Sequence, residues 1–190
     1  MKKDQIKNLL EQNPLYAGNK IRTYTGKYID VFNLKKEDID IEDIINALSH
    51  APRYGGHMKK QISVLRHTFH VISYLKDEKN ILAALLHDAS EAYLCDMPKP
   101  IKMLLPGYLD LEEKIMKAIA ATFEFEYPLN EDVENADKLA LEYEFITFKL
   151  KYSIVDRLKD IFFLRNNKRI LKRKFRKTFL KYYKAHLDEK

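Results

Sequence analysis

Residues 81–86, ILAALL, are apolar at every position, so a helix formed there would be hydrophobic around its whole circumference. Such a helix is stable only in a protein interior, where neighbouring elements cover all of its sides. It leads directly into His87 and Asp88, and Glu91 and Asp96 follow within the next ten residues. Ionisable side chains rarely gather at a buried helix end unless a cation or a reacting group compensates them. The segment therefore predicts a central helix with a chemically active end.

The segments around this helix predict a mainly α-helical fold with a small N-terminal β-hairpin. Thr25 and Gly26 separate two short strand-like runs, which is a hairpin signal. Asp40 is the expected cap of a helix that ends before Pro52, and Asn130 is the expected cap of a later helix. Further helices are expected over residues 2–12, 62–76, 79–90, 107–125 and 155–187.

Length and composition fit one domain over residues 1–190. The chain is 46% hydrophobic and 33% charged, with few glycines and prolines, which indicates a globular protein that can bury a substantial core. Its apolar runs stay below the roughly 18 residues that a membrane span requires. Asp4 and Glu11 also occur where a signal peptide is uncharged. We therefore expect a cytoplasmic protein without a membrane segment.

Cys95 is the only cysteine, so a metal site in this chain would need histidine and carboxylate ligands. His67 lies in the helix expected just before the central one, and adjacent antiparallel helices can bring it close to His87. Asp88 and Asp137 are the natural carboxylates, since Asp137 lies among core-facing positions of a later helix. Two imidazoles and two carboxylates suit a divalent ion such as Mn²⁺, Fe²⁺, Co²⁺, Zn²⁺ or Mg²⁺.

The order His67, then His87 and Asp88, then Asp137 resembles the H…HD…D signature of the HD-domain metal-dependent phosphohydrolases. The stretches ISVLRHTFHV and ALLHDASEAYLCDMPKPIK look like the branch that contains bacterial 5'-deoxynucleotidases and phage deoxynucleoside triphosphohydrolases. TYTGKYIDVF and IDIEDIINALSHAPRYGGH look like the same segments of the phage-type members. The resemblance covers about residues 20–145 and implies an HD-domain helical bundle.

The resemblance also implies which residues perform the chemistry. It implies that a divalent ion is bound by the four residues of the signature, His67, His87, Asp88 and Asp137. It further implies that Glu91 and Asp96 handle the proton and the attacking water. Hydrolysis of a phosphoester requires a nucleophilic water, a group that binds the charge, and a proton donor or acceptor. The plainer alternative is that Glu91 and Asp96 only face solvent.

Substrate contacts are implied for residues on two loops. Arg53 matches a phosphate-binding arginine of the family, and a guanidinium can bind two phosphate oxygens at once. Lys102 matches a lysine expected at the phosphates, with Lys99 as the weaker candidate; ordinary surface roles for Arg53 and Lys102 are the alternatives. His57 could contact the nucleotide or close its loop by hydrogen bonding. His70 departs from the family, which has an aliphatic residue there, so a core or supporting role is expected rather than a fifth ligand.

Together these features predict an enzyme that hydrolyses deoxynucleotides with a metal-activated water. A triphosphate substrate, cleaved to nucleoside and triphosphate, is favoured because two lysines after Asp96 suit a long phosphate chain. A monophosphate substrate, as in the 5'-deoxynucleotidases, is the alternative. Two rival interpretations are a nucleotide- or nucleic-acid-binding module without turnover, and hydrolysis of an alarmone or a cyclic nucleotide. No spacing in the sequence indicates a base preference.

The positive charge of the chain is concentrated in a basic C-terminal extension, about residues 150–190. Residues 149–190 contain 15 Lys and Arg against 4 Asp and Glu, whereas the preceding part is net acidic. One interpretation is a helix that binds nucleic acid or an anionic surface. Another is an amphipathic helix whose apolar residues pack on the body, namely Ile170, Phe175, Phe179 and Tyr182. A third is a subunit interface in a homo-oligomer, or a positive field that attracts nucleotides.

Overall fold

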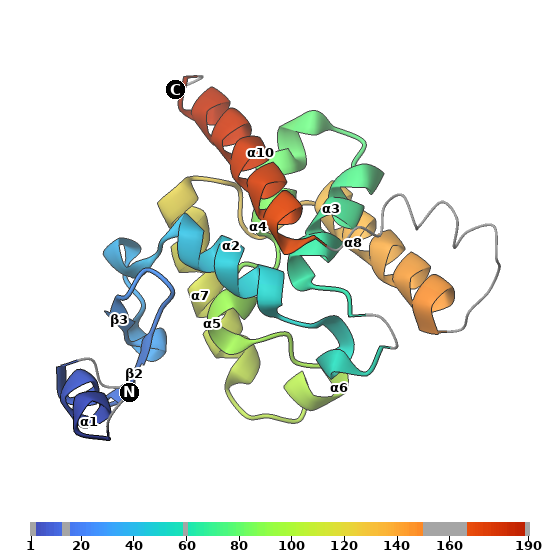
Figure 1. Cartoon of the computed structure of the whole chain (residues 1–190). Helices are drawn as coiled ribbons and strands as arrows, with labels where there is room; N and C mark the ends of the chain where they lie inside the picture. The colour runs from blue at the N-terminus through green and yellow to red at the C-terminus, as the bar shows by residue number, and fades with distance from the viewer. Residues whose placement is uncertain (1–2, 13–15, 59–60, 150–166, 189–190) are drawn as a thin grey trace.

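The computed structural model of the chain describes residues 3–12, 16–58, 61–149 and 167–188. Its helices are α1 (Lys3–Gln12), α2 (Ile41–His50), α3 (Val64–Tyr74), α4 (Ile81–Leu86), α5 (Glu91–Leu94), α6 (Lys99–Lys102), α7 (Tyr108–Phe123), α8 (Glu131–Glu144) and α10 (Lys168–Asp188) (Figure 1). The strands are β1 (Tyr16–Ala17), β2 (Lys20–Arg22) and β3 (Tyr28–Ile29). Short helical turns connect these elements: η1 (Val31–Asn33), η2 (Lys36–Asp38), η3 (Arg53–Gly56), η4 (Glu78–Asn80) and η5 (Phe145–Lys149). The predicted mainly α-helical class is confirmed.

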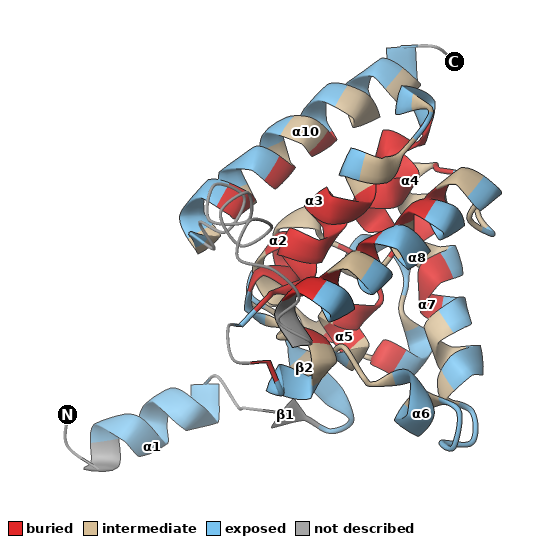
Figure 2. Ribbon diagram, turned by 90° about the vertical axis from the view of Figure 1, so that its right-hand side faces the viewer, coloured by how far each residue is buried: buried red, intermediate tan, exposed pale blue. Residues whose placement is uncertain are grey.

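Helix α4 lies inside the bundle, as its apolar sequence predicts. Every residue of α4 is buried, and α3 and α10 pack against it. Figure 2 shows the buried positions of α2, α3 and α4 facing one another beneath the outer helices. One cluster of buried apolar side chains extends from β3 to α10. Because close-packed interiors deform little, this core gives the residues after α4 a rigid base.

The helix expected over residues 79–90 is shorter than predicted. Helix α4 ends at Leu86, and four residues form a tight turn before α5 begins at Glu91. In this turn the backbone N–H groups of Ala89 and Glu91 donate to the carbonyls of Leu86 and Asp88, both at 3.0 Å. Hydrogen bonds that span three residues wind the chain more tightly than those of an α-helix. Side chains of the turn therefore project at angles that a continuous helix would not give.

The predicted hairpin is confirmed and has one strand more than expected. β2 pairs antiparallel with both β3 and β1. Gly26 occupies the turn with a φ of +92°, a conformation that other residues adopt at a cost. The backbone N–H and the hydroxyl of Thr25 donate to the carboxylate of Asp43 at 2.6 and 2.9 Å. These two bonds fasten the hairpin to α2.

Both predicted helix caps are present. The side chain of Asp40 accepts the N–H of Glu42 at 3.0 Å where α2 begins. The side chain of Asn130 accepts the N–H of Val133 at 3.2 Å where α8 begins. Such caps satisfy backbone donors that the first helical turn leaves unpaired. Helix α8 then packs along α3, the helix that carries His67.

Helix α10 packs one apolar face on the body, as the amphipathic interpretation predicts. Leu171, Phe175 and Phe179 are buried, and the ring of Phe179 meets that of Phe123 edge to face, 5.3 Å between centroids. Ile170, which was expected on this face, is 52% exposed. One position along a helix rotates the side chain by about 100°, so Leu171 occupies the place predicted for Ile170.

Both helices that were predicted near the ends of the chain are present. The helix predicted near the N-terminus is present as α1, which stands apart from the body in Figures 1 and 2. The C-terminal helix is confirmed as α10, while residues 155–166 of the predicted range lie outside the described residues. In the described segments, no helix combines the length and apolarity needed to cross a bilayer.

Candidate metal centre and its cleft

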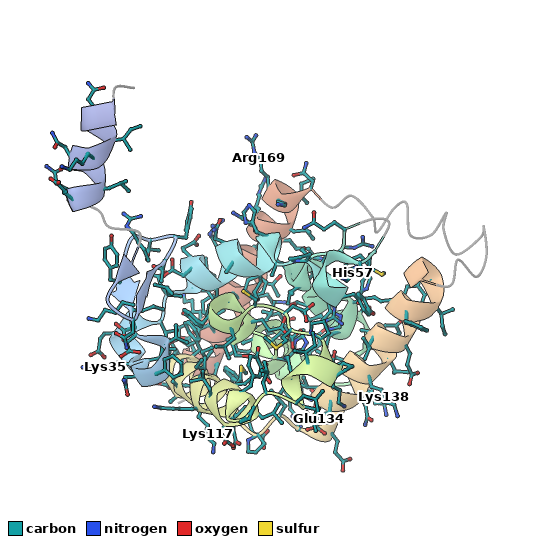
Figure 3. All side chains as sticks on the ribbon, turned by 90° about the horizontal axis from the view of Figure 1, so that it is seen from below. Lys35, His57, Lys117, Glu134, Lys138 and Arg169 are labelled. Atoms are coloured by element: carbon teal, nitrogen blue, oxygen red, sulfur yellow. The ribbon has the colours of Figure 1, made fainter. Side chains whose placement is uncertain are left out.

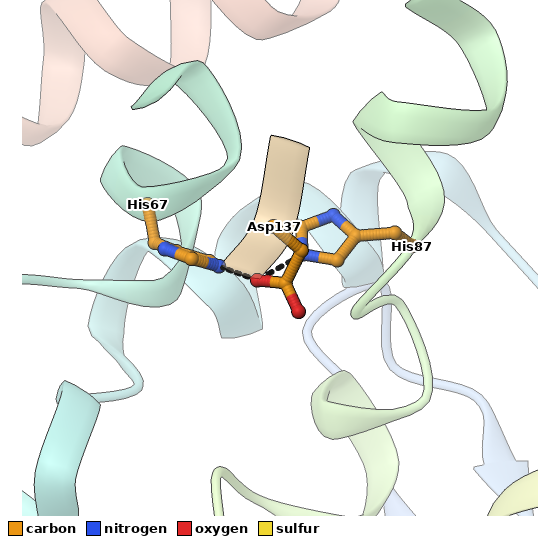
Figure 4. Close-up of side chains that lie close together, drawn as sticks. All are labelled: His67, His87 and Asp137. Carbon is orange, nitrogen blue, oxygen red and sulfur yellow. Dashed lines mark hydrogen bonds and ion pairs between the residues drawn. The ribbon is translucent and has the colours of Figure 1, made fainter. Parts of the chain in front are cut away.

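Three side chains that are distant in sequence converge beside α4. His67 comes from α3, His87 from the turn after α4, and Asp137 from α8 (Figure 4). Each offers a ligand atom, and these atoms lie within 4.8 Å of one another. Asp137 Oδ1 is 2.8 Å from His67 Nε2 and 3.8 Å from His87 Nε2. Two imidazole nitrogens and a carboxylate oxygen are typical donors for a divalent ion, so this group could hold one.

Asp88 borders the same group. Its Oδ2 is 3.1 Å from His87 Nε2 and 3.7 Å from His67 Nε2. Among the described residues, neither His87 Nε2 nor Asp88 Oδ2 finds a hydrogen-bond partner, although both atoms are buried. Native interiors leave few polar atoms in this state. A cation between the two atoms would satisfy both, so the residues present fit a metal ion.

The electrostatics of the group favour a positive charge. Burial alone would lower the pKa of His87, but the charge of Asp88, aided by Asp137, raises that pKa to about 9. Burial would likewise raise the pKa of Asp88, but the charge of His87 outweighs it and lowers that pKa. A proton on His87 therefore supplies the positive charge that a divalent ion would supply. The proton and an ion would compete for the same lone pair on Nε2.

Hydrogen bonds on the opposite ring nitrogens orient both histidines. His87 Nδ1 donates to the carbonyl of Ala84 at 2.8 Å. His67 Nδ1 lies 3.1 Å from a carboxylate oxygen of Glu144, to which it donates. Both rings therefore direct Nε2 toward Asp137. Contacts of this kind fix the tautomer and the ring plane of a metal-binding histidine.

Glu144 is a site residue that the sequence alone did not reveal. Its side chain is fully buried, and besides His67 it binds His70 Nδ1 at 2.9 Å and Arg53 Nε at 3.3 Å. Burial would raise the pKa of Glu144, but its hydrogen bonds to the two histidines lower it. Its one sequence signal is its place seven residues after Asp137, two helical turns along the same face. His70 thus contacts the carboxylate that orients His67.

A cleft of about 490 Å³ opens beside the metal group. Its polar lining consists of Arg53, Tyr54, Asp88, Glu91, Asp96, Lys99, Lys102, Glu112 and Asp137. Its apolar lining consists of Met97, Pro98, Pro100, Met103, Leu109 and Leu141. The volume lies within the usual range of small-molecule sites. His57, a predicted substrate contact, does not line this cleft and lies at the outer surface (Figure 3).

Glu91 and Asp96 have raised pKa values in this cleft. Glu91 is 6% exposed, and its burial, together with the charges of Asp88 and Asp96, raises its pKa well above the ordinary value. Burial also raises the pKa of the half-buried Asp96, although Arg53 opposes the effect. A carboxyl group with a raised pKa can accept and release a proton near neutral pH. The interpretation of Glu91 as a solvent-facing carboxylate is therefore wrong.

The three cations of the cleft differ in how far they are already paired. Arg53 is buried among carboxylates, which contradicts an ordinary surface role. Lys102 Nζ lies 2.6 Å from a carboxylate oxygen of Glu112 and 3.5 Å from one of Glu91. Lys99 is exposed at the edge of the cleft. Lys102, the stronger of the two lysine candidates, is thus held by protein carboxylates.

Two residues with left-handed backbone conformations flank the cleft. Tyr54, directly after Arg53, has a φ of 58°, and Cys95, directly before Asp96, has a φ of 66°. For residues other than glycine this conformation costs on the order of 1 kcal/mol or more and persists only where the surroundings impose it. The unusual conformations accompany the turns that place Arg53 and Asp96 in the cleft lining.

Comparison with known proteins places the chain among bacterial relatives. No family model matches it. It is 37% identical to the uncharacterized protein YfdR of Escherichia coli over 124 aligned residues. The aligned region is 65% of this chain and 69% of YfdR. The chain belongs to the YfdR family. It is also 31% identical to the uncharacterized protein RCAP_rcc00048 of Rhodobacter capsulatus over 128 aligned residues. That aligned region is 63% of this chain and 65% of the relative.

Binding of Mn²⁺ should depend steeply on pH. Because the pKa of His87 is raised to about 9, the ion must displace a proton at any lower pH. We expect the affinity measured by calorimetry to rise about tenfold per pH unit below that pKa and to level off above it. Asp137→Asn should weaken binding at every pH, whereas Asp110→Asn, the same change at an exposed position of α7, should not. An affinity that is equal at all pH values would contradict this expectation.

Removing the charge of Glu144 should also weaken metal binding. Glu144→Gln keeps the shape of the side chain but removes the carboxylate that orients His67, so we expect an affinity loss of about 10- to 100-fold. Glu142→Gln is the matched control, because Glu142 is exposed on the same helix. If both variants bound Mn²⁺ as tightly as the unchanged protein, Glu144 would have no part in the site.

Proposed function

We propose that this chain is a metal-dependent phosphohydrolase of the HD type that acts on deoxynucleotides. The observation that carries the proposal is the convergence of His67, His87 and Asp137, with Asp88 beside them, on a cleft that also contains Glu91. Their order along the chain is that of the H…HD…D signature. A divalent ion bound there would activate a water molecule and polarise a phosphoryl oxygen.

The residues of the cleft have separate tasks in this proposal. Arg53 binds the phosphate, because its guanidinium lines the cleft and Glu144 holds its Nε in place. Glu91 takes up a proton from the attacking water and Asp96 assists at the leaving oxygen, since burial raises the pKa of both carboxyls. The apolar side chains of Met103, Leu109 and their neighbours exclude water and pack against the nucleoside.

The pairing of Lys102 favours a monophosphate substrate over the triphosphate that the two lysines first suggested. A triphosphate carries more negative charge and needs several free cations along its length. Lys102 is engaged by Glu112 at 2.6 Å, which leaves Lys99 as the exposed lysine of the cleft. Binding of a longer phosphate chain would require Lys102 to leave Glu112. In this second, narrower proposal the products are a deoxynucleoside and phosphate.

A binding module without turnover is the less economical explanation of the same residues. Buried carboxyl groups with raised pKa values are costly to a fold and are typical of catalytic sites. Glu91 has one oxygen that is buried without a hydrogen-bond partner in the described structure, a cost that a proton-transfer role would explain. Nucleotide binding alone would require no such group beside the ion.

Hydrolysis assays with the pure protein test the proposal. Deoxynucleoside mono- and triphosphates are each incubated with Mn²⁺ or Co²⁺. A monophosphate should yield nucleoside and phosphate, whereas a triphosphate should yield nucleoside and triphosphate, so the products identify the substrate. Glu91→Gln should lower kcat by about 10²-fold or more, because it removes the proton-transfer group. Glu113→Gln, the same change on the exposed side of α7, serves as the control. Absence of hydrolysis with every ion and nucleotide would refute the proposal.

A further inference from the structure

The outward side of α10 is strongly basic and has no task in the proposed function. Helix α10 is 21 residues long, and none of the residues 168–187 is acidic. We call its exposed cations the outward basic face: Arg169, Arg173, Lys174, Lys177, Lys181 and Lys184. Four of them, Arg169, Arg173, Lys177 and Lys181, recur every fourth residue, about 6 Å apart along the axis. They form a continuous row of positive charge.

Other cations of α10 contact polar side chains of the body, but those of the outward basic face do not pair with a described carboxylate. Arg176 pairs with Glu42, and Lys172 donates to Asn46, so both are engaged by α2. In the part of the chain that the structure describes, no carboxylate lies within 4.0 Å of a nitrogen of the outward basic face. Lys174 instead lies over the ring of Phe69, 4.3 Å from its centroid. Within the described residues, the charge of the face is therefore not compensated by carboxylates.

The burial of the apolar side of α10 decides between two kinds of anionic partner. A helix that binds a membrane surface inserts its apolar side among the lipids. In α10 that side is part of the core, since Phe175 is 0% and Phe179 3% exposed. The outward apolar residues Ile170, Leu180 and Leu187 are separated from one another by cations. A phosphate backbone, which is bound through charge alone, fits this surface better than a bilayer.

The outward basic face is also separate from the cleft. In Figure 2, α10 runs along the top of the molecule, whereas α6, which contributes to the cleft, lies at the bottom; in Figure 1, α6 again lies at the lower edge, away from α10. Arg169 points away from the body (Figure 3). The face is therefore poorly placed to draw a nucleotide into the cleft. It constitutes a cationic surface of its own, apart from the cleft.

We propose that the outward basic face of α10 binds the phosphate backbone of a nucleic acid strand, without regard to sequence. The row of cations would replace the counterions that surround the phosphates. Tyr24 is 65% exposed, and its ring centroid lies 5.6 Å from Lys172 Nζ, so it offers a base an aromatic surface beside the helix. This inference rests on α10 and does not depend on the proposed hydrolysis.

Fluorescence anisotropy of a labelled single strand of about 20 nucleotides, as DNA and as RNA, tests the inference with the full chain. Affinity should fall steeply between about 50 and 200 mM salt. The triple variant Arg173→Gln, Lys177→Gln, Lys181→Gln should weaken binding at least tenfold at low salt. In a plot of log K against log salt concentration, the slope should become less steep by about 2, since each phosphate contact with a single strand contributes about 0.7 to it.

The control is the triple variant Lys20→Gln, Lys35→Gln, Lys36→Gln, which removes the same charge from exposed positions outside α10. It should leave the salt dependence nearly unchanged. Equal effects of the two triple variants, or absence of binding at low salt, would overturn the inference. Displacement of the strand by excess deoxynucleotide would place binding in the cleft and also overturn it. Binding to phosphatidylserine vesicles but not to nucleic acid would show that the partner is a membrane.

Discussion

A single buried carboxylate, that of Glu144, joins the parts of the site to one another. It binds His67 and His70 on α3 and Arg53 in η3, while it belongs to α8. A buried charge destabilises a fold by several kcal/mol unless its hydrogen-bonding capacity is filled. Three donors fill it here. The orientation of His67 and the position of Arg53 therefore depend on one carboxylate, which also links α3 to α8 beside their apolar contacts.

The charge balance of the site follows from this arrangement. Apart from Glu144, the carboxyls of Asp88, Glu91, Asp96 and Asp137 lie around one guanidinium and the imidazoles. Burial, together with the charges of Asp88 and Asp96, raises the pKa of Glu91, whereas the charges of Asp88 and Asp137 raise the pKa of His87 against the effect of burial. A divalent ion would supply positive charge and release protons in exchange. Metal binding and proton transfer are thus linked through the same few groups.

Features that depend on neighbours in sequence could be predicted from the sequence. The caps Asp40 and Asn130, the hairpin turn at Gly26 and the buried α4 each follow from a local pattern, and the structure contains all of them. The convergence of His67, His87 and Asp137 was predicted from helix adjacency and from the order of a signature.

Features that depend on packing between distant segments were missed. Glu144 is 77 residues from His67, and no local pattern connects the two. Lys102 lines the cleft as its predicted phosphate contact requires, but its pairing with Glu112 on α7 was not foreseen from the sequence. The turn after α4 was expected to continue as helix. Its tighter hydrogen bonding, from Ala89 to Leu86 and from Glu91 to Asp88, is visible only in the folded chain.

A crystal structure of the protein with Mn²⁺, together with an anomalous difference map, tests the candidate metal centre most directly. We expect one strong anomalous peak between His67, His87, Asp88 and Asp137, about 2.0–2.3 Å from the ligating nitrogen and oxygen atoms. Both Nε2 atoms should contact it, and Glu144 should remain on His67 Nδ1. A peak elsewhere, or no peak at saturating Mn²⁺ above the pKa of His87, would contradict the assignment of these residues as a metal centre.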